Sequence, residues 1–88
     1  MTEIVKKAWA GTLESSDAYV EVEPAQELII ELQSVVQAQF GDAIEAAVRS
    51  VLTECGVERV CVKVMDRGAL ECVIRDRVET ALLRGREE

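Results

Sequence analysis

The sequence predicts an α+β fold: a small mixed β-sheet with two helices packed on one face, in the order (β)ββαβα. Apolar and polar residues alternate in short segments, which is the period of half-buried strands. Two longer segments repeat their apolar residues every three or four positions, as amphipathic helices do. The 88 residues suffice for one hydrophobic core but not for two, so we expect a single domain over residues 1–88.

The first elements are strands, predicted from alternation and from the residues that end each run. Residues 8–13 are a candidate for an additional first strand, although Gly11 and the small alanines lower strand propensity. Residues 18–23 alternate apolar and polar side chains and end at Pro24. Residues 28–33 alternate in the same way. The short connection between these two strands favours an antiparallel hairpin.

The first helix is predicted to begin at Asp42 and to stop at Gly56. Asp42 can cap the helix, with Glu45 three residues further on completing a capping box. The residues expected to face the core recur at helical spacing; they are Ile44, Ala47, Val48, Val51, Leu52 and Cys55.

The last two elements are a strand over residues 60–65 and a second helix. Asp66-Arg67-Gly68 is predicted to turn the chain between them. The helix is expected to stop at Gly85, with residues 84–88 frayed, and its apolar positions are Leu70, Val73, Ile74, Val78, Ala81 and Leu82. A strand-helix-strand passage permits a crossover connection, which is why we expect a mixed sheet.

Composition argues against several classes of function. The net charge of −7 repels phosphate backbones, so no nucleic-acid partner is expected. The chain has no histidine, the usual general base and the commonest metal ligand, so no catalytic residue and no metal site are expected. No apolar run approaches the roughly 20 residues of a membrane-spanning helix, and no apolar stretch of signal-peptide length follows Lys6 and Lys7, so no signal peptide is expected. We therefore expect a cytoplasmic protein without a membrane partner.

The cysteines and aromatic residues favour structural roles. Cys55, Cys61 and Cys72 are odd in number and lack CxxC spacing, so free, mostly buried thiols are expected. Trp9 and Phe40 are nearly the only large aromatics, and we expect both to fill the core rather than to stack on bases.

Residues 14–17, Glu-Ser-Ser-Asp, are predicted to form a turn that projects Ser15 into solvent. A nucleophilic serine needs a nearby base and oxyanion donors, but the chain has no histidine and no GxSxG motif. A serine that is only modified needs exposure and a mobile backbone. The acidic residues around this turn are either a solvated edge that discourages aggregation or a surface for a basic partner; they are Glu14, Asp17, Glu21 and Glu23.

Three segments together resemble the family of citrate lyase acyl carrier proteins, the gamma subunits of that enzyme. They are Ala-Gly-Thr-Leu-Glu-Ser at 10–15, Gln-Phe-Gly-Asp-Ala-Ile at 39–44 and Asp-Arg-Gly-Ala-Leu-Glu-Cys at 66–72. In this family the serine after Gly-Thr-Leu-Glu carries 2'-(5''-phosphoribosyl)-3'-dephospho-coenzyme A through a phosphodiester, which implies that Ser15 is the attachment residue. Many relatives have glycine directly after that serine. Here Ser16 takes the position and is the second, less favoured candidate.

The resemblance implies a non-catalytic carrier whose second and third motifs act structurally. The thiol of the attached group would hold acetate as a thioester, the alpha subunit would exchange that acetyl for citrate, and the beta subunit would cleave the citryl thioester. The implied partners are these two subunits, a prosthetic-group transferase and an acetylating ligase. Two alternatives are a carrier of citramalate lyase or malonate decarboxylase, and an unmodified adaptor whose acidic edge docks a partner.

Overall fold

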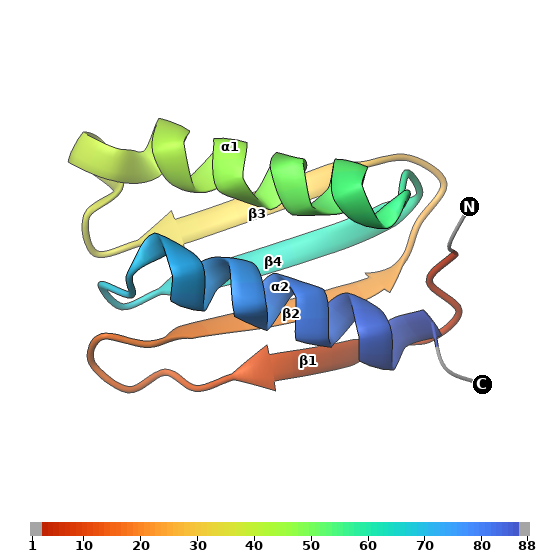
Figure 1. Ribbon diagram of the computed structural model, residues 1–88, viewed down its shortest axis with the longest axis horizontal. Helices are drawn as coiled ribbons and strands as arrows, with labels where there is room; N and C mark the ends of the chain where they lie inside the picture. The colour runs from red at the N-terminus through yellow and green to blue at the C-terminus, as the bar shows by residue number, and fades with distance from the viewer. Residues whose placement is uncertain (1–2, 87–88) are drawn as a thin grey trace.

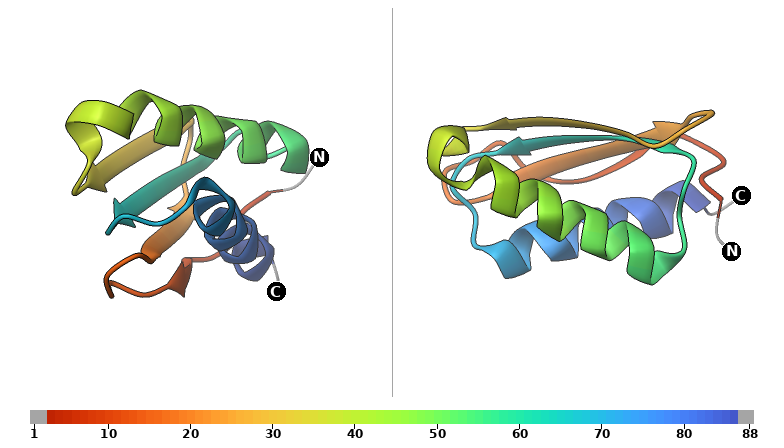
Figure 2. Two further views of the ribbon diagram at one scale, coloured as in Figure 1. Left: turned by 60° about the vertical axis from the view of Figure 1, so that its left-hand side comes forward. Right: turned by 90° about the horizontal axis from the view of Figure 1, so that it is seen from above.

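The computed structural model describes residues 3–86, which form two layers: a four-stranded sheet and a pair of helices (Figure 1). Both helices cover the same face of the sheet (Figure 2). The predicted α+β class, element order and one-sided packing are confirmed. The elements are β1 (Ala8–Gly11), β2 (Ala18–Pro24), β3 (Ile29–Ser34), α1 (Gln37–Cys55), β4 (Val60–Asp66) and α2 (Glu71–Arg86).

The strands lie in the order β1-β2-β4-β3. β2 is antiparallel to both of its neighbours, while β3 is parallel to β4 and is joined to it by α1. The predicted hairpin between β2 and β3 is therefore wrong, because β4 lies between them. Their connection lacks the glycine or asparagine of a tight hairpin turn. Four extended residues reach about 13 Å, enough to cross the roughly 10 Å that two strand spacings occupy.

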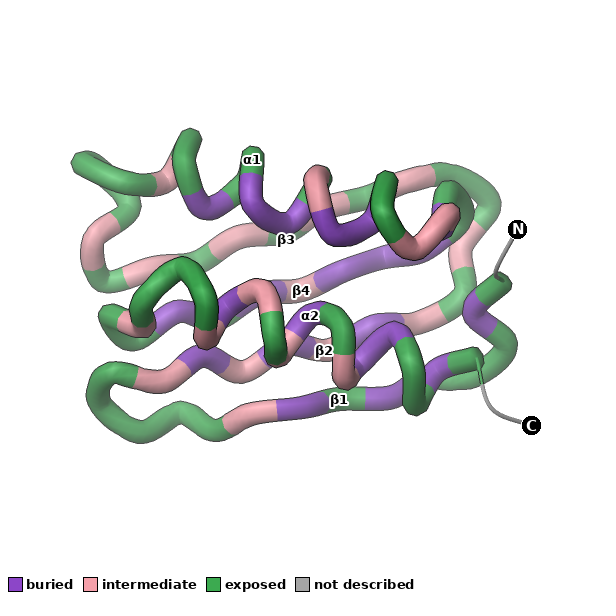
Figure 3. The backbone as a smooth tube through the Cα atoms, in the orientation of Figure 1, coloured by how far each residue is buried: buried purple, intermediate pink, exposed green. Residues whose placement is uncertain are grey.

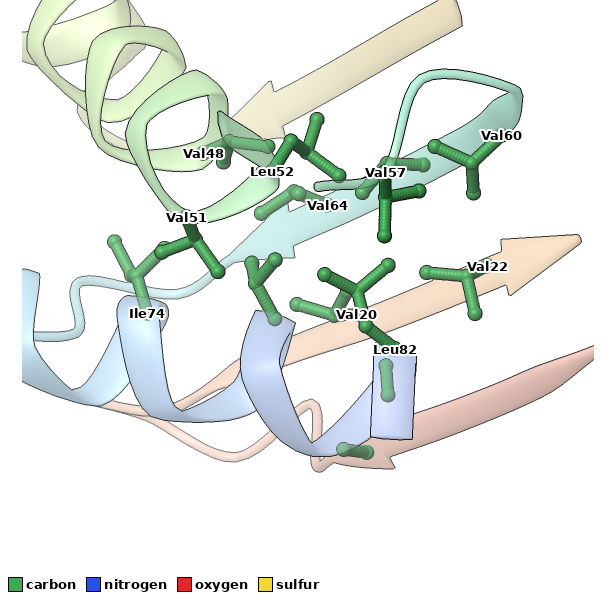
Figure 4. Close-up of a cluster of buried hydrophobic side chains, with 14 of the residues drawn as sticks. Val20, Val22, Val48, Val51, Leu52, Val57, Val60, Val64, Ile74 and Leu82 are labelled. Carbon is green, nitrogen blue, oxygen red and sulfur yellow. The ribbon is translucent and has the colours of Figure 1, made fainter. Parts of the chain in front are cut away.

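The core lies between the sheet and the two helices (Figure 3). Every second residue of β2 and β4 points to the helices, and most of these residues are valines. The buried apolar faces of α1 and α2 pack against them (Figure 4). The predicted alternation and helical spacing are confirmed at these positions. The central side chains, all at most 2% exposed, include Val20, Val22, Val62, Val64, Val48, Val51, Leu52, Ile74 and Val78.

Helix α1 begins earlier than predicted, at Gln37 instead of Asp42. Its N-cap residue, Val36, makes no side-chain cap. Instead, the Gln37 Oε1 atom accepts a hydrogen bond from the Ser34 amide at 3.3 Å. The spacing of four residues from Val36 through Phe40 to Ile44 is the sequence signal that extends the helix backwards. Its end at Gly56, in the left-handed region at φ 69°, is as predicted.

Helix α2 differs from the prediction at both ends. Leu70 precedes the helix and is 72% exposed, so it is not part of the buried stripe. Gly85 does not stop the helix but is buried within it. A Cβ atom there would lie 3.1 Å from Cγ2 of Val22, so glycine lets the helix approach the sheet closely. Of the predicted frayed end, residues 84–86 are helical and 87–88 lie outside the described residues.

The aromatic prediction is wrong for both residues, since Trp9 and Phe40 are each 54% exposed. Trp9 points to the face of the sheet that no helix covers, because its neighbours Ala8 and Ala10 occupy the buried face. The cysteine prediction holds for Cys61, which is buried, and fails for Cys72, which is exposed on α2. Within residues 3–86, no helix has both the length and the apolar character to cross a membrane.

Candidate functional site

The predicted turn at residues 14–17 joins β1 to β2 (Figure 1). The Asp17 amide donates a hydrogen bond to the Glu14 carbonyl oxygen at 3.1 Å, which places Ser15 and Ser16 at the two central positions. Both serines are exposed. The prediction that Ser15 projects into solvent is confirmed.

Ser16 has a φ of 66°, the only positive value for a non-glycine residue in the described chain. A positive φ at the third residue and not at the second is the pattern of a type II turn, which favours glycine there. This geometry favours glycine at the position directly after the candidate serine. Serine can occupy the position, but at the steric cost of a left-handed backbone.

Gly11 ends β1 and shapes the start of the connection. Its φ is +90°, and a Cβ atom at this position would lie 1.9 Å from the Ala18 carbonyl oxygen. No rotation of a side chain relieves this contact, because the obstructing atom belongs to the backbone. Residue 11 therefore has to be glycine for β1 and β2 to keep their register up to the turn.

The Asp17 carboxylate accepts hydrogen bonds that hold together the connection between β1 and β2. Its Oδ2 accepts a hydrogen bond from Thr12 Oγ1 at 2.7 Å, and its Oδ1 accepts one from the Ala18 amide at 2.7 Å. Nε and Nη2 of Arg77 on α2 donate to the two carboxylate oxygens at 3.1 and 3.2 Å. We call this bidentate pair the Asp17–Arg77 clamp.

Hydrogen bonds from Arg77, then from Thr12 and from the Ala18 amide, lower the pKa of Asp17 to about 2. This carboxylate is only 16% exposed. The interpretation of the acidic residues as one solvated edge is therefore wrong for Asp17. Glu21 and Glu23 lie apart from the turn, along the uncovered face of β2, where Glu21 pairs with Lys7.

The turn is also tied to the loop between β4 and α2. The Ser16 amide donates to the Arg67 carbonyl oxygen at 2.9 Å, and the Arg67 amide donates to the Asp17 carbonyl oxygen at 2.9 Å. The structure thus provides the exposure that a modified serine needs, while hydrogen bonds to Arg67 hold the backbone of the turn in place. Any reach beyond the turn has to come from a group attached to it.

The three sequence motifs meet at this end of the molecule (Figure 1). The first forms the end of β1 and the turn, the second forms the first turns of α1, and the third joins β4 to α2. Between the last two lies an apolar groove with a volume of about 310 Å³. Exposed Phe40 and Leu70 line it, together with Val36 and Ile44. The sequence did not reveal this groove, because Leu70 fits the spacing of buried residues and Phe40 is expected in the core as a large aromatic.

Asp66 at the end of β4 holds the same region together, a role that the sequence did not indicate. It is 2% exposed. Its carboxylate accepts hydrogen bonds from Ser34 Oγ at 2.7 Å and from the Ala69 amide at 2.9 Å. One buried carboxylate thus connects the end of β3 to the loop before α2.

The chemistry available to the turn is limited. Within residues 3–86, neither serine hydroxyl of the turn takes part in a hydrogen bond. The carboxylate nearest in sequence with a lowered pKa, Asp17, is a weak base and is already engaged by Arg77. Burial raises the pKa values of the Cys55 and Cys61 thiols, which makes them poor nucleophiles. The site can present a hydroxyl but does not activate it.

Comparisons with known proteins match this chain to carrier subunits of citrate lyase and malonate decarboxylase. The family of the malonate decarboxylase delta subunit matches residues 5–85. Citrate lyase acyl carrier protein 2 of Salmonella typhimurium is 52% identical over 87 residues, covering 97% of this chain and 90% of the relative. Citrate lyase acyl carrier protein of Escherichia fergusonii is 51% identical over 88 residues, covering 98% of this chain and 91% of the relative.

The fold also matches a solved structure. A chain in the crystal structure of a Pseudomonas malonate decarboxylase hetero-tetramer in complex with malonate superposes with a TM-score of 0.81. The match covers 94% of this chain and 87% of the other, at 22% sequence identity. At this identity the likeness concerns the fold alone.

Proposed function

Because this chain belongs to the family of acyl carrier proteins of citrate lyase and malonate decarboxylase, we propose that it is the acyl carrier subunit of a citrate lyase. The observation that carries the proposal is the exposed Ser15, presented on a fixed turn within a sequence that is 52% identical to a citrate lyase acyl carrier protein. Carriers of this kind work within complexes of several subunits.

The choice of citrate lyase over malonate decarboxylase rests on sequence identity. Citrate lyase carriers are about half identical to this chain over nearly its whole length. The malonate decarboxylase chain with the same fold is 22% identical. A malonate decarboxylase carrier is the second candidate, favoured by the match of residues 5–85 to the delta-subunit family.

We place the covalent attachment at Ser15, and the proposed group is 2'-(5''-phosphoribosyl)-3'-dephospho-coenzyme A. Ser15 and Ser16 are both exposed, so accessibility alone does not separate them. The turn geometry supports Ser15, because residue 16 occupies the position where glycine is preferred and residue 15 does not. A phosphodiester on Ser15 would extend from the turn into solvent. Arg67, whose backbone is hydrogen-bonded to Ser16 and Asp17, is exposed, and its positive charge suits a phosphate.

The group would supply a terminal thiol that carries acyl groups as thioesters. The residues of this chain hold the attachment point still and leave the chemistry to partner active sites. Tethering makes each encounter with those sites intramolecular, with effective concentrations of the order of mM for short flexible tethers. We propose the lyase alpha and beta subunits, a prosthetic-group transferase and an acetylating ligase as the proteins that meet the serine.

Loading by the transferase tests this proposal. The chain is co-expressed with the transferase and the enzymes that make the group, and its intact mass is measured. We expect one adduct on the wild type and on Ser16→Ala, and none on Ser15→Ala. Both variants should remain folded, because both side chains are exposed and alanine at position 16 has the same Cβ atom that serine already places there. An adduct that persists in Ser15→Ala and disappears in Ser16→Ala would move the attachment to Ser16.

A further inference from the structure

The turn that presents Ser15 is tied to α2 by side chains that the proposed function does not use. Asp17 lies two residues after Ser15, and Arg77 lies sixty residues further along the chain. Their two hydrogen bonds, at 3.1 and 3.2 Å, join the connection between β1 and β2 to the middle of α2. Bidentate pairs of this kind fix relative orientation as well as distance.

Neither member of the pair belongs to the hydrophobic core. Arg77 is 38% exposed and Asp17 is 16% exposed, so both lie at the edge of the buried layer. The same helix carries a comparable contact elsewhere: Nη2 of Arg75 lies 2.7 Å from Glu54 Oε2 on α1. That pair joins two helices and does not touch the turn. The two arginines therefore differ in what they hold in place.

We infer that Asp17 and Arg77 are positioning residues, which hold the Glu14–Asp17 turn in the shape that the loading enzyme recognises. This inference rests on the proposed function. The loading reaction forms a bond between Ser15 Oγ and the phosphorus of a phosphoanhydride-activated donor. The bond from phosphorus to the leaving phosphate breaks, and the hydroxyl proton passes to a base of the enzyme. A turn that is already ordered loses less conformational entropy when the enzyme binds it.

The predicted effect is on recognition. Without the clamp, the enzyme has to order the turn itself, and this raises KM for the apo carrier. The reaction within the complex proceeds with the same groups, so kcat stays near its wild-type value. We expect kcat/KM of Arg77→Leu to fall roughly 10- to 100-fold through the rise in KM, which corresponds to the entropy cost of ordering the backbone of about one or two residues.

The experiment compares loading kinetics of wild type, Arg77→Leu, Arg77→Lys and Arg75→Leu, by intact mass, well below their melting temperatures. We expect KM to rise for Arg77→Leu and to recover partly in Arg77→Lys, which keeps the charge but not the bidentate geometry. Arg75→Leu should load like the wild type. A folded Arg77→Leu with wild-type KM, or an equal rise for Arg75→Leu, would overturn the inference.

Amide hydrogen exchange tests, independently of loading, whether the Asp17–Arg77 clamp orders the turn. The Ser16 amide is hydrogen-bonded to the Arg67 carbonyl oxygen, and the Asp17 amide to that of Glu14. Both amides should exchange faster in Arg77→Leu than in the wild type, and at the wild-type rate in Arg75→Leu. Unchanged exchange in Arg77→Leu would refute the inference. Failure of the wild type to load would instead refute the proposed function, while the exchange measurement still decides whether the clamp orders the turn.

Discussion

Three residues shape the presentation of Ser15, each for a different physical reason. Gly11 is required because any Cβ would collide with the Ala18 carbonyl oxygen. Ser16 tolerates a left-handed backbone that glycine would adopt without steric cost. Asp17 collects hydrogen bonds from Thr12, the following amide and Arg77. The residues around Ser15 therefore determine the backbone conformation that exposes this serine.

Ser16→Gly should stabilise the protein. Removing the Cβ relieves a left-handed backbone that costs about 1–2 kcal/mol, and the greater freedom of glycine in the unfolded chain offsets part of this. We expect the free energy of unfolding to rise by about 0.5–1 kcal/mol in urea denaturation. Ser15→Gly is the matched control and should give no gain, because φ is not positive there. Equal effects of the two substitutions would show that backbone strain is not the cause.

Asp17 makes stability depend on pH in acid. Its pKa is lowered from 3.8 to about 2 in the folded protein, so the ionised form is stabilised by folding. This contribution is fully present above the unfolded pKa and is lost as pH falls from about 4 through about 2. Wild type should therefore be more stable than Asp17→Asn at pH 6, with the difference shrinking across this window. Melting temperatures at several pH values measure it, and a constant difference would contradict the assignment.

At the scale of elements, local periodicity predicts where the strands and helices lie in the sequence, but it does not predict which strands pair with one another. The predicted alternation in β2 and β4 matches the buried valines, and the stripe of α1 matches from Ile44 to Leu52. The position of β4 between β2 and β3 depends on a crossover through α1, which no local signal specifies. The start of α1 differs from the prediction for a related reason: Ser34 and Gln37 organise its first turn without the expected cap at Asp42.

The candidate site was predictable only in part. The turn and the exposure of Ser15 follow from the local sequence Glu-Ser-Ser-Asp. The hydrogen bonds that hold the turn in place do not follow from the local sequence, since Arg77 and the Arg67 backbone lie about fifty to sixty residues away. Asp66 was interpreted as an ordinary turn residue, although it is buried and accepts hydrogen bonds from two other segments. Such contacts need the tertiary fold before they can be recognised.

Asp66→Ala should destabilise the protein strongly. The substitution leaves the Ser34 hydroxyl and the Ala69 amide, which belong to half-buried residues, without this acceptor, and each such loss costs up to about 3 kcal/mol. We expect about 2–5 kcal/mol less free energy of unfolding in urea. Asp42→Ala, on the exposed side of α1, is the control and should change it by less than about 0.5 kcal/mol. A small effect at Asp66 would mean that water replaces its oxygens.

At the scale of the whole molecule, the serine turn and the ends of the described chain lie at opposite ends of the sheet (Figure 1). The Val5 and Lys6 amides both donate to the Gly85 carbonyl oxygen, which brings the two ends together. The three motifs gather at the other end, around Asp66 and the groove. The structure is therefore a compact support, about 33 × 21 × 18 Å, with the proposed attachment site at one end.

The most direct test is to locate the adduct in the wild-type chain loaded in cells that also produce the lyase subunits and the transferase. Cleavage after glutamate releases residues 15–21, Ser-Ser-Asp-Ala-Tyr-Val-Glu, and electron-transfer fragmentation separates Ser15 from Ser16. We predict that the intact peptide carries the mass of phosphoribosyl-dephospho-coenzyme A and that the fragment 16–21 lacks it. An adduct retained on fragment 16–21, or an unmodified peptide in an active complex, would contradict the proposal that Ser15 is the anchor.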